Sequence, residues 1–201
     1  MNTFDAIYQR RAVKHYDPEH EFSEDEIQKL MEAAIQSPTS FNMQNWRFVL
    51  VRDKDLRQQI RAAASDQAHV TEASLLIVMT ADVKAWEKSP QRYWREAPPE
   101  VAELLVNWMG PFYSGKDQLQ RDEAMRSCGI AGQTIMLAAK AMGYDSCPMI
   151  GFDAEQVAKL INIPDDHVVS FMIAVGKATK PAWPKPGQLP LDEVIVHDKF
   201  A

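Results

Sequence analysis

Apolar positions recur along the chain with two different spacings, which predict both helices and strands. In residues 23–36 the apolar side chains fall on one side of a helix, and Ser23 with Glu26 forms a capping box at its start. Residues 74–80 are instead a continuous apolar run of strand length. Such a run is typical of a strand that is covered on both faces.

The same signals predict the remaining elements. Helices are expected at 3–10, 53–65, 99–109, 120–142 and 153–161, and strands at 47–52, 74–80, 146–150 and 168–175. Thr3 is expected to cap the first helix, and Gly143 is expected to end the long one. The second half of the long helix is apolar or small nearly all round, which is typical of a helix buried in a core or in a subunit interface. The mixed order predicts one α+β domain over residues 1–201.

Two segments differ from this pattern. Residues 84–118 hold many aromatic side chains among prolines and charges. They form either an ordinary insertion that packs on the domain or a mobile, aromatic-lined cap over a binding site. The proline-rich tail, residues 177–201, is expected to be extended and to lie on a surface of this subunit or of a partner.

Composition and charge narrow the classes of function. The 201 residues are 46% hydrophobic and 25% charged, which is typical of a folded soluble domain. The net charge is −6 and the pI about 5.4, so we expect no nucleic-acid or membrane partner. The chain opens without the pattern of a signal peptide. Two cysteines, Cys128 and Cys147, are too few for a disulfide framework and indicate reduced thiols in a cytoplasmic protein.

Self-contained catalytic motifs are missing from the sequence. It lacks cysteine and histidine pairs with zinc spacing, a Gly-x-Ser-x-Gly elbow, a phosphate-binding loop of the nucleotide triphosphatases and the dinucleotide fingerprint Gly-x-Gly-x-x-Gly. We therefore expect neither a metal site nor a catalytic side chain. If the chain is an enzyme, a bound cofactor supplies its reactivity.

Three short segments carry polar groups in excess of what their local structure requires. Residues 10–14 contain three cations, which suit either a helix C-terminus or an anion site. Residues 37–46 are dense in hydroxyl and amide groups. They form either a helix-terminating turn or a rim of hydrogen-bond partners for a polar ring. Residues 147–153 pass from a strand to a helix through Gly151, either as a plain turn or as backbone that approaches the edge of a flat ring.

In this order and spacing, the segments resemble the nitroreductase family of flavin mononucleotide (FMN) enzymes over nearly the whole chain. The matching motifs are Phe-x-x-Ile-x-x-Arg-Arg at 4–11, Ser-Pro-Thr-Ser-x-Asn-x-Gln-x-Trp at 37–46, Cys-Pro-x-x-Gly-Phe-Asp at 147–153 and the proline-rich ending at 184–194. The resemblance implies a three-layer α/β/α sandwich with a mixed, mostly antiparallel sheet. It also implies an intertwined homodimer that holds FMN between its subunits.

The resemblance assigns a role to each matching position. Arg10, Arg11 and Lys185 match cations that grip the FMN phosphate, and Lys14 matches the base near the N1/O2 edge of the ring. Gln67 and His69 match the region that contacts the pyrimidine edge of the flavin. The segment that lies against the ring near N5 is matched by Pro148, Met149, Ile150 and Gly151. Pro38, Thr39, Ser40 and Asn42 match residues that reach the flavin bound mainly by the other subunit. Three positions depart from residues that are common in the family. Ala12 stands in place of a hydroxyl residue and Gly187 in place of an arginine, and each change removes a phosphate contact. Asn45 stands in place of a proline.

The implied activity is ping-pong hydride transfer from NADH or NADPH through flavin N5 to a nitroaromatic, quinone or similar acceptor. Two alternatives remain open from the sequence. One is another flavin chemistry on the same fold, namely dehalogenation, azoline oxidation or flavin fragmentation. The other is a protein that binds FMN without turnover.

Overall fold

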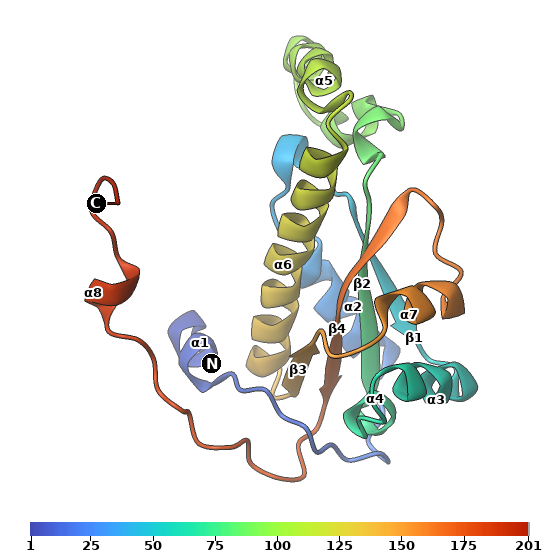
Figure 1. Ribbon diagram of the computed structural model, residues 1–201, viewed down its shortest axis with the longest axis vertical. Helices are drawn as coiled ribbons and strands as arrows, with labels where there is room; N and C mark the ends of the chain where they lie inside the picture. The colour runs from blue at the N-terminus through green and yellow to red at the C-terminus, as the bar shows by residue number, and fades with distance from the viewer. Residues whose placement is uncertain (201) are drawn as a thin grey trace.

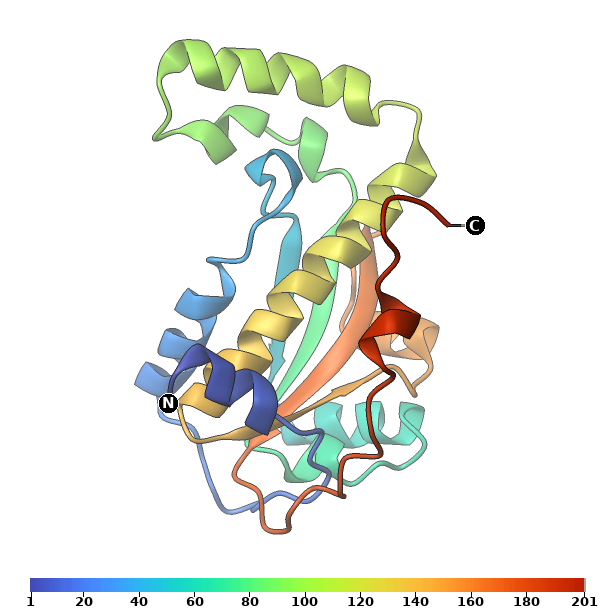
Figure 2. The same ribbon diagram turned by 90° about the vertical axis from the view of Figure 1, so that its left-hand side faces the viewer.

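The computed structural model describes residues 1–200 and places a sheet between two layers of helices (Figures 1 and 2). Four strands, β1 (Trp46–Val51), β2 (Leu75–Asp82), β3 (Asp145–Met149) and β4 (His167–Gly176), are arranged in the order β1-β2-β4-β3. Each neighbouring pair is antiparallel. A parallel contact occurs outside the strands, in an isolated bridge between Ala12 and Ser146. The predicted α+β three-layer sandwich is confirmed, although its sheet is antiparallel rather than mixed.

Helices cover both faces of this sheet. One layer contains α2 (Glu24–Ala34) and the long α6 (Asp117–Ala141), with α1 (Thr3–Gln9) packed near the end of α6. The opposite layer contains α3 (Lys54–Ala63), α4 (His69–Glu72) and α7 (Ala154–Leu160). The other helical segments are η1 (Ser40–Asn42), η2 (Ala85–Glu87), η3 (Pro90–Trp94), α5 (Pro99–Tyr113) and α8 (Leu191–Val194).

The central strand β2 connects the two layers because its side chains alternate between two cores. Leu75, Ile77 and Met79 pack in the core shared with α2 and α6. Leu76 and Val78 pack in the core shared with α3 and α7. All residues of β2 are buried, as the continuous apolar run predicted.

Local sequence signals set several helix ends as predicted. The side chains of Ser23, Asp53 and Asp153 each accept a backbone N–H in the first turn of α2, α3 and α7. Gly143 follows α6 with a φ of 91°, a left-handed conformation that costs glycine little.

The cap of the first helix differs from the prediction. Asn2, and not Thr3, caps α1: the Asn2 side chain accepts the N–H of Asp5 at 2.9 Å, and the Asp5 carboxylate accepts the N–H of Asn2. This reciprocal pair satisfies two of the amides that a helix N-terminus leaves unpaired.

The two helices that flank residue 115 are longer than predicted. Helix α5 continues through Pro111 to Tyr113, and α6 begins at Asp117. Met109 and Tyr113 are buried in one aromatic cluster, so their packing outweighs the local preference of proline for ending a helix. Among residues 1–200, no helix is both long and apolar enough to cross a membrane.

Gly132 determines how closely α6 approaches the sheet. A Cβ atom added at Gly132 would lie 2.3 Å from Cζ of Phe171 and 3.4 Å from Cδ1 of Ile173, both on β4. A Cβ added at Gly129, one turn earlier, would meet no heavy atom within 4 Å. Gly132 therefore faces the core, whereas Gly129 leaves a shallow place on the outer surface of α6.

We predict that Gly132→Ala lowers the free energy of unfolding by about 1–3 kcal/mol, because overpacking a close-packed core forces neighbouring groups apart. Denaturant unfolding measures this change. Phe171→Leu removes the atoms that clash, so the double variant should lose less stability than the sum of the two single variants. Strictly additive losses would show that Phe171 does not limit this position.

Candidate functional site

One group of predicted site residues comes together where the end of α6, α1 and β3 meet (Figure 2). After α1 the chain runs beside β3: the N–H of Val13 donates to the carbonyl of Ser146 at 3.1 Å, next to the Ala12–Ser146 bridge. We call this group the basal site. It consists of Arg10, Arg11, Ala12, Lys14, Gln67, His69, Pro148, Met149, Ile150, Gly151 and Lys185.

Positive charge accumulates in the basal site. Burial raises the pKa of the Cys147 thiol, while the nearby charges of Lys14 and Arg10 act in the opposite direction. Burial lowers the pKa of His69, and Lys14 lowers it further, so the imidazole is neutral at pH 7. Nη1 of Arg10 is buried, and nothing in residues 1–200 accepts a hydrogen bond from it. This unpaired donor among cations, in a chain of net charge −6, suits an anionic group.

The tail places a further cation against α1. The Arg11 guanidinium donates to the carbonyl of Trp183, and Nζ of Lys185 donates to the carbonyl of Tyr8 at 2.8 Å. Gly187 has a φ of 116°, where an arginine would be strained. Glycine therefore suits the backbone conformation at this position.

The other side of the basal site is formed by Gln67, His69 and the end of β3. Nε2 of Gln67 donates to the carbonyl of Gly151 at 2.9 Å, which ties this turn to the layer of α3 and α4. Nε2 of His69 is buried without a hydrogen-bond partner in the described chain. Met149 is buried, but Ile150 is 81% exposed. Residues 150–151 therefore present an open edge beside Lys14 and His69.

The second group of predicted residues lies near the opposite end of α6 (Figures 1 and 2). Pro38, Thr39, Ser40 and Asn42 belong to the segment after α2, and η1 in this segment packs against η3. We call residues 38–44 the apical loop. At 1.5 Å per residue the 25 residues of α6 span about 37 Å. The loop begins beside the second half of α6, where Oγ of Ser37 donates to Oγ1 of Thr134 at 2.9 Å, and Ser40 then meets Tyr113 just before the start of α6. In one chain, η1 and the basal site therefore lie near opposite ends of α6.

The apical loop has an unusual backbone. Phe41, Asn42 and Gln44 have φ angles of 51°, 50° and 45°, a region that residues other than glycine adopt at a cost of about 1–2 kcal/mol each. Such strain persists where the surroundings fix it, and it is common at ligand-binding sites.

Hydrogen bonds fix the polar side chains of this loop. Oγ1 of Thr39 accepts the N–H of Gln44 at 2.9 Å, Oγ of Ser40 accepts the phenol of Tyr113 at 2.8 Å, and Nδ2 of Asn42 donates to the carbonyl of Tyr93 at 2.7 Å. The hydroxyl groups of Thr39 and Ser40 serve here as acceptors, so each retains its own proton to donate.

Residues 84–118 combine features of the two interpretations given above. Tyr93 and Tyr113 are buried in a cluster with Met43 of the apical loop, as in an ordinary packed insertion. Trp108 and Phe112 are 56% and 44% exposed on α5 and present an aromatic surface.

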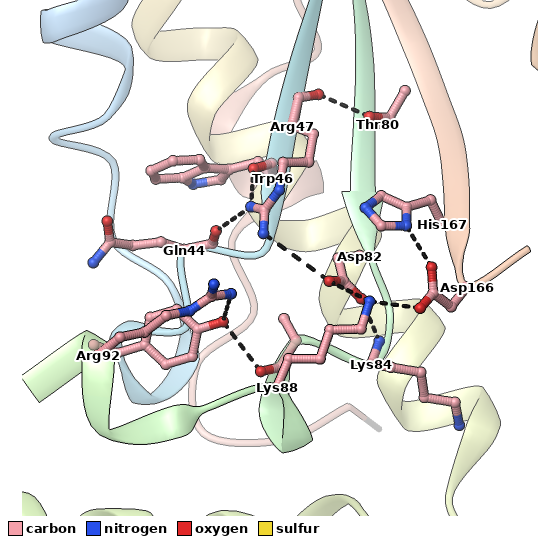
Figure 3. Close-up of polar contacts among 12 residues, drawn as sticks. Gln44, Trp46, Arg47, Thr80, Asp82, Lys84, Lys88, Arg92, Asp166 and His167 are labelled. Atoms are coloured by element: carbon pink, nitrogen blue, oxygen red, sulfur yellow. Dashed lines mark hydrogen bonds and ion pairs between the residues drawn. The ribbon is translucent and has the colours of Figure 1, made fainter. Parts of the chain in front are cut away.

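An ion-pair cluster that the sequence did not predict joins this segment to the sheet (Figure 3). The side chain of Asp82, at the end of β2, is 3% exposed, and Nζ of Lys88 lies 2.8 Å from it and 2.5 Å from Asp166. Nδ1 of His167 lies 2.7 Å from the Asp166 carboxylate, and Arg47 lies 4.0 Å from Asp82. Lys88 and His167 lower the pKa of Asp166 through hydrogen bonds. The one sequence signal of this cluster was Asp82, a charged residue at the end of the apolar strand β2.

The cluster also contains groups that can ligate a metal. Asp82, Asp166 and His167 lie close enough together to share an ion. Burial alone would lower the pKa of Lys88, but its two carboxylate partners raise it overall. The Lys88 ammonium group therefore already pairs with both carboxylates, and the cluster links the segment between η2 and η3 to the sheet.

A cavity of about 610 Å³ opens between the apical loop and η3, with Asn42, Gln44, Arg47, Arg92 and Trp94 in its wall. A second cavity, of about 480 Å³, lies beside His20 and Arg57. Neither is lined by residues of the basal site.

The fold and these residues define a class of protein that the comparisons identify. Residues 7–177 match the nitroreductase family, and the chain belongs to that family.

The chain is 58% identical to the protein DrgA of Synechocystis, over 99% of this chain and 97% of that protein. It is 31% identical to "Putative NAD(P)H nitroreductase YodC" of Bacillus subtilis, over 96% of this chain and 97% of that protein. The solved structure of a "putative NAD(P)H:FMN oxidoreductase" from Staphylococcus epidermidis has a TM-score of 0.91 at 25% identity, covering 98% of this chain and 95% of that one.

We predict that Lys88→Met lowers the free energy of unfolding by about 1–3 kcal/mol, because it leaves the buried Asp82 carboxylate without its ion-pair partner. Chemical denaturation measures the loss. Asp166→Asn should cost less, since Lys88 keeps its contact with Asp82. Adding Asp82→Asn to Lys88→Met should restore part of the stability, and a double variant no more stable than Lys88→Met would contradict this account.

Proposed function

We propose that this protein is an FMN-dependent NAD(P)H oxidoreductase that acts as a homodimer and reduces nitroaromatic, quinone or similar acceptors. The observation that carries the proposal is the buried, unpaired Nη1 of Arg10 in the cationic basal site. Leaving such a donor unsatisfied costs about 1–3 kcal/mol, and a phosphate oxygen removes that cost. The names of YodC and of the Staphylococcus epidermidis protein, which mention NAD(P)H and FMN, support the same assignment.

The residues present fit FMN at both of its ends. Arg10, Arg11 and Lys185 supply cations for the phosphate, and the guanidinium groups match its geometry with paired donors. The open edge at residues 150–151 leaves room for a flat ring next to Lys14. Ala12 and Gly187 contribute no side-chain donor, so the remaining cations carry the phosphate contact.

Neither cysteine is suited to act as a nucleophile. Burial raises the pKa of Cys128 to about 12 and raises that of Cys147, so both are neutral thiols at pH 7. This is the state expected where the cofactor carries the chemistry. When bound, the flavin accepts a hydride from NAD(P)H and passes the two electrons to an acceptor.

The protein provides orientation and charge for that reaction. Lys14 holds a fixed positive charge at the pyrimidine edge of the ring site, where negative charge develops. His69 is neutral and has an unpaired ring nitrogen, which can donate or accept a hydrogen bond at the same edge. Ile150 and Gly151 offer an exposed edge on the other side of the ring site.

A second copy of the chain completes the site. Because η1 lies near the other end of α6 from the basal site of its own chain, each site combines the basal site of one subunit with the apical loop of the other. Two-fold symmetry gives two such sites in each dimer. Exposed apolar side chains on the same side of the molecule support this arrangement: Ile130 on α6 is 44% exposed and Phe4 on α1 is 69% exposed. The shallow place at Gly129 lets another helix approach α6.

The tail supports an intertwined dimer. Its last part, with α8, lies apart from the body of the subunit and ends away from the sheet (Figure 1). Trp183, Leu191 and Val194 are 84%, 72% and 56% exposed. A partner subunit lying against the tail would cover these side chains.

We predict that Arg10→Gln weakens FMN binding about 10- to 100-fold, because it removes charge-assisted hydrogen bonds of about 1.5–3 kcal/mol each from the phosphate. Titration of FMN into the flavin-free protein, followed by flavin fluorescence, measures the affinity.

The matched control is Arg52→Gln, which removes an exposed arginine paired with Glu24 and should leave FMN binding unchanged. Equal FMN affinity in Arg10→Gln and wild type would refute the phosphate role of Arg10. If wild type also fails to bind FMN, the proposed function itself is wrong.

A further inference from the structure

The cavity beside the apical loop has no role in holding FMN as proposed above. It lies between residues 42–47 and residues 92–97 and has a volume of about 610 Å³. The hydrogen bond from Asn42 to the carbonyl of Tyr93 joins its two walls at one side. Because Asn42 belongs to the loop that meets the flavin of the other subunit, the cavity opens next to the place where a substrate would stack.

Three arginines and one glutamate line this cavity. Nη2 of Arg92 donates to the phenol oxygen of Tyr93 at 2.7 Å, and no carboxylate in the described part of the chain lies within 4.0 Å of this guanidinium. Arg95 is 80% exposed and only loosely paired with Glu96, at 3.5 Å. Arg47 donates to the carbonyls of Gln44 and Trp46.

The cavity therefore has an excess of positive charge. The only carboxylate near Arg47 among residues 1–200 is that of Asp82, at 4.0 Å, which shares Lys88 with Asp166 (Figure 3). The excess charge therefore comes from Arg92 and Arg95, which face Glu96 alone. Arg92 retains donors that face no anion. The chain as a whole has a net charge of −6, so this group of guanidinium ions is a local region of opposite sign that can attract an anionic ligand.

We propose that this cavity binds the phosphate groups of the dinucleotide electron donor, with Arg92 and Arg95 as the contacting residues. The inference rests on the proposed function, because it needs the nicotinamide of that donor to stack at the neighbouring flavin. Guanidinium groups bind phosphate through paired hydrogen bonds. The half-buried Trp94 adds an aromatic wall against which a nucleobase can stack.

The reductive half-reaction of the FMN-loaded protein tests this proposal. Stopped-flow absorbance follows flavin reduction at increasing concentrations of NADPH, NADH and 1-benzyl-1,4-dihydronicotinamide, which carries no phosphate. In Arg92→Gln and in Arg95→Gln, the Kd for NAD(P)H should rise about tenfold, which corresponds to the loss of one charged hydrogen bond. The limiting rate of flavin reduction should stay near that of wild type. Reduction by the benzyl compound should not change.

Two controls separate charge from structure. Tyr93→Phe removes the hydrogen bond of Arg92 but keeps the cation, so it should bind NAD(P)H nearly as wild type does. Because Arg95 is exposed, its replacement keeps the proposal testable if Arg92→Gln fails to fold. Titration with adenosine 2′,5′-bisphosphate and with 5′-AMP then identifies the phosphate: loss of affinity for the bisphosphate alone indicates the 2′-phosphate, and loss for both indicates the pyrophosphate.

Unchanged Kd values for NADPH and NADH in both arginine variants would overturn the proposal. An equal loss of reduction by the benzyl compound would also overturn it, because the arginines would then act on the ring site and not on phosphate. Failure of the proposed function looks different: wild-type protein would hold no FMN, or no reductant would bleach it.

Discussion

The fold depends on the burial of β2 on both faces. Its alternate side chains enter the core under α2 and α6 and the core under α3 and α7, so both helical layers pack on one strand. This arrangement fixes α6 across the sheet, and the missing side chain of Gly132 lets the helix lie close to β4. The direction of α6 then sets the distance between the basal site near its end and η1 of the apical loop near its start.

That distance explains why the site residues of one chain look incomplete. The basal site has cations, an unpaired guanidinium nitrogen and an exposed edge at Ile150. The apical loop has a strained backbone with its polar groups held by η3 and α5. Two copies related by two-fold symmetry would combine an open cationic surface with a rigid polar edge, which neither copy can do alone. Residues 84–118, tied to the sheet through Lys88, hold that edge in place.

Much of the fold could be predicted from the sequence because its signals are local. The four strands and the caps of Ser23, Asp53 and Asp153 follow from apolar spacing and from single side chains. Helix α5 continued past Pro111 because tertiary packing outweighs local preference there. The site positions came from the family resemblance. The Asp82–Lys88–Asp166 cluster and the arginine-lined cavity join segments far apart in the chain, and no local pattern marks such contacts.

The central claim is that each FMN is held by the basal site of one subunit and the apical loop of the other, and mixed dimers test it most directly. One subunit would carry Arg10→Gln. The other would carry Ser40→Asp, which keeps an acceptor for Tyr113 but adds a negative charge beside the ring. Bound flavin is then counted in purified heterodimers. The account predicts that each variant homodimer binds FMN poorly, while the heterodimer regains one tight site per dimer. Heterodimers without any tight site would contradict it, because each subunit would then hold its own FMN alone.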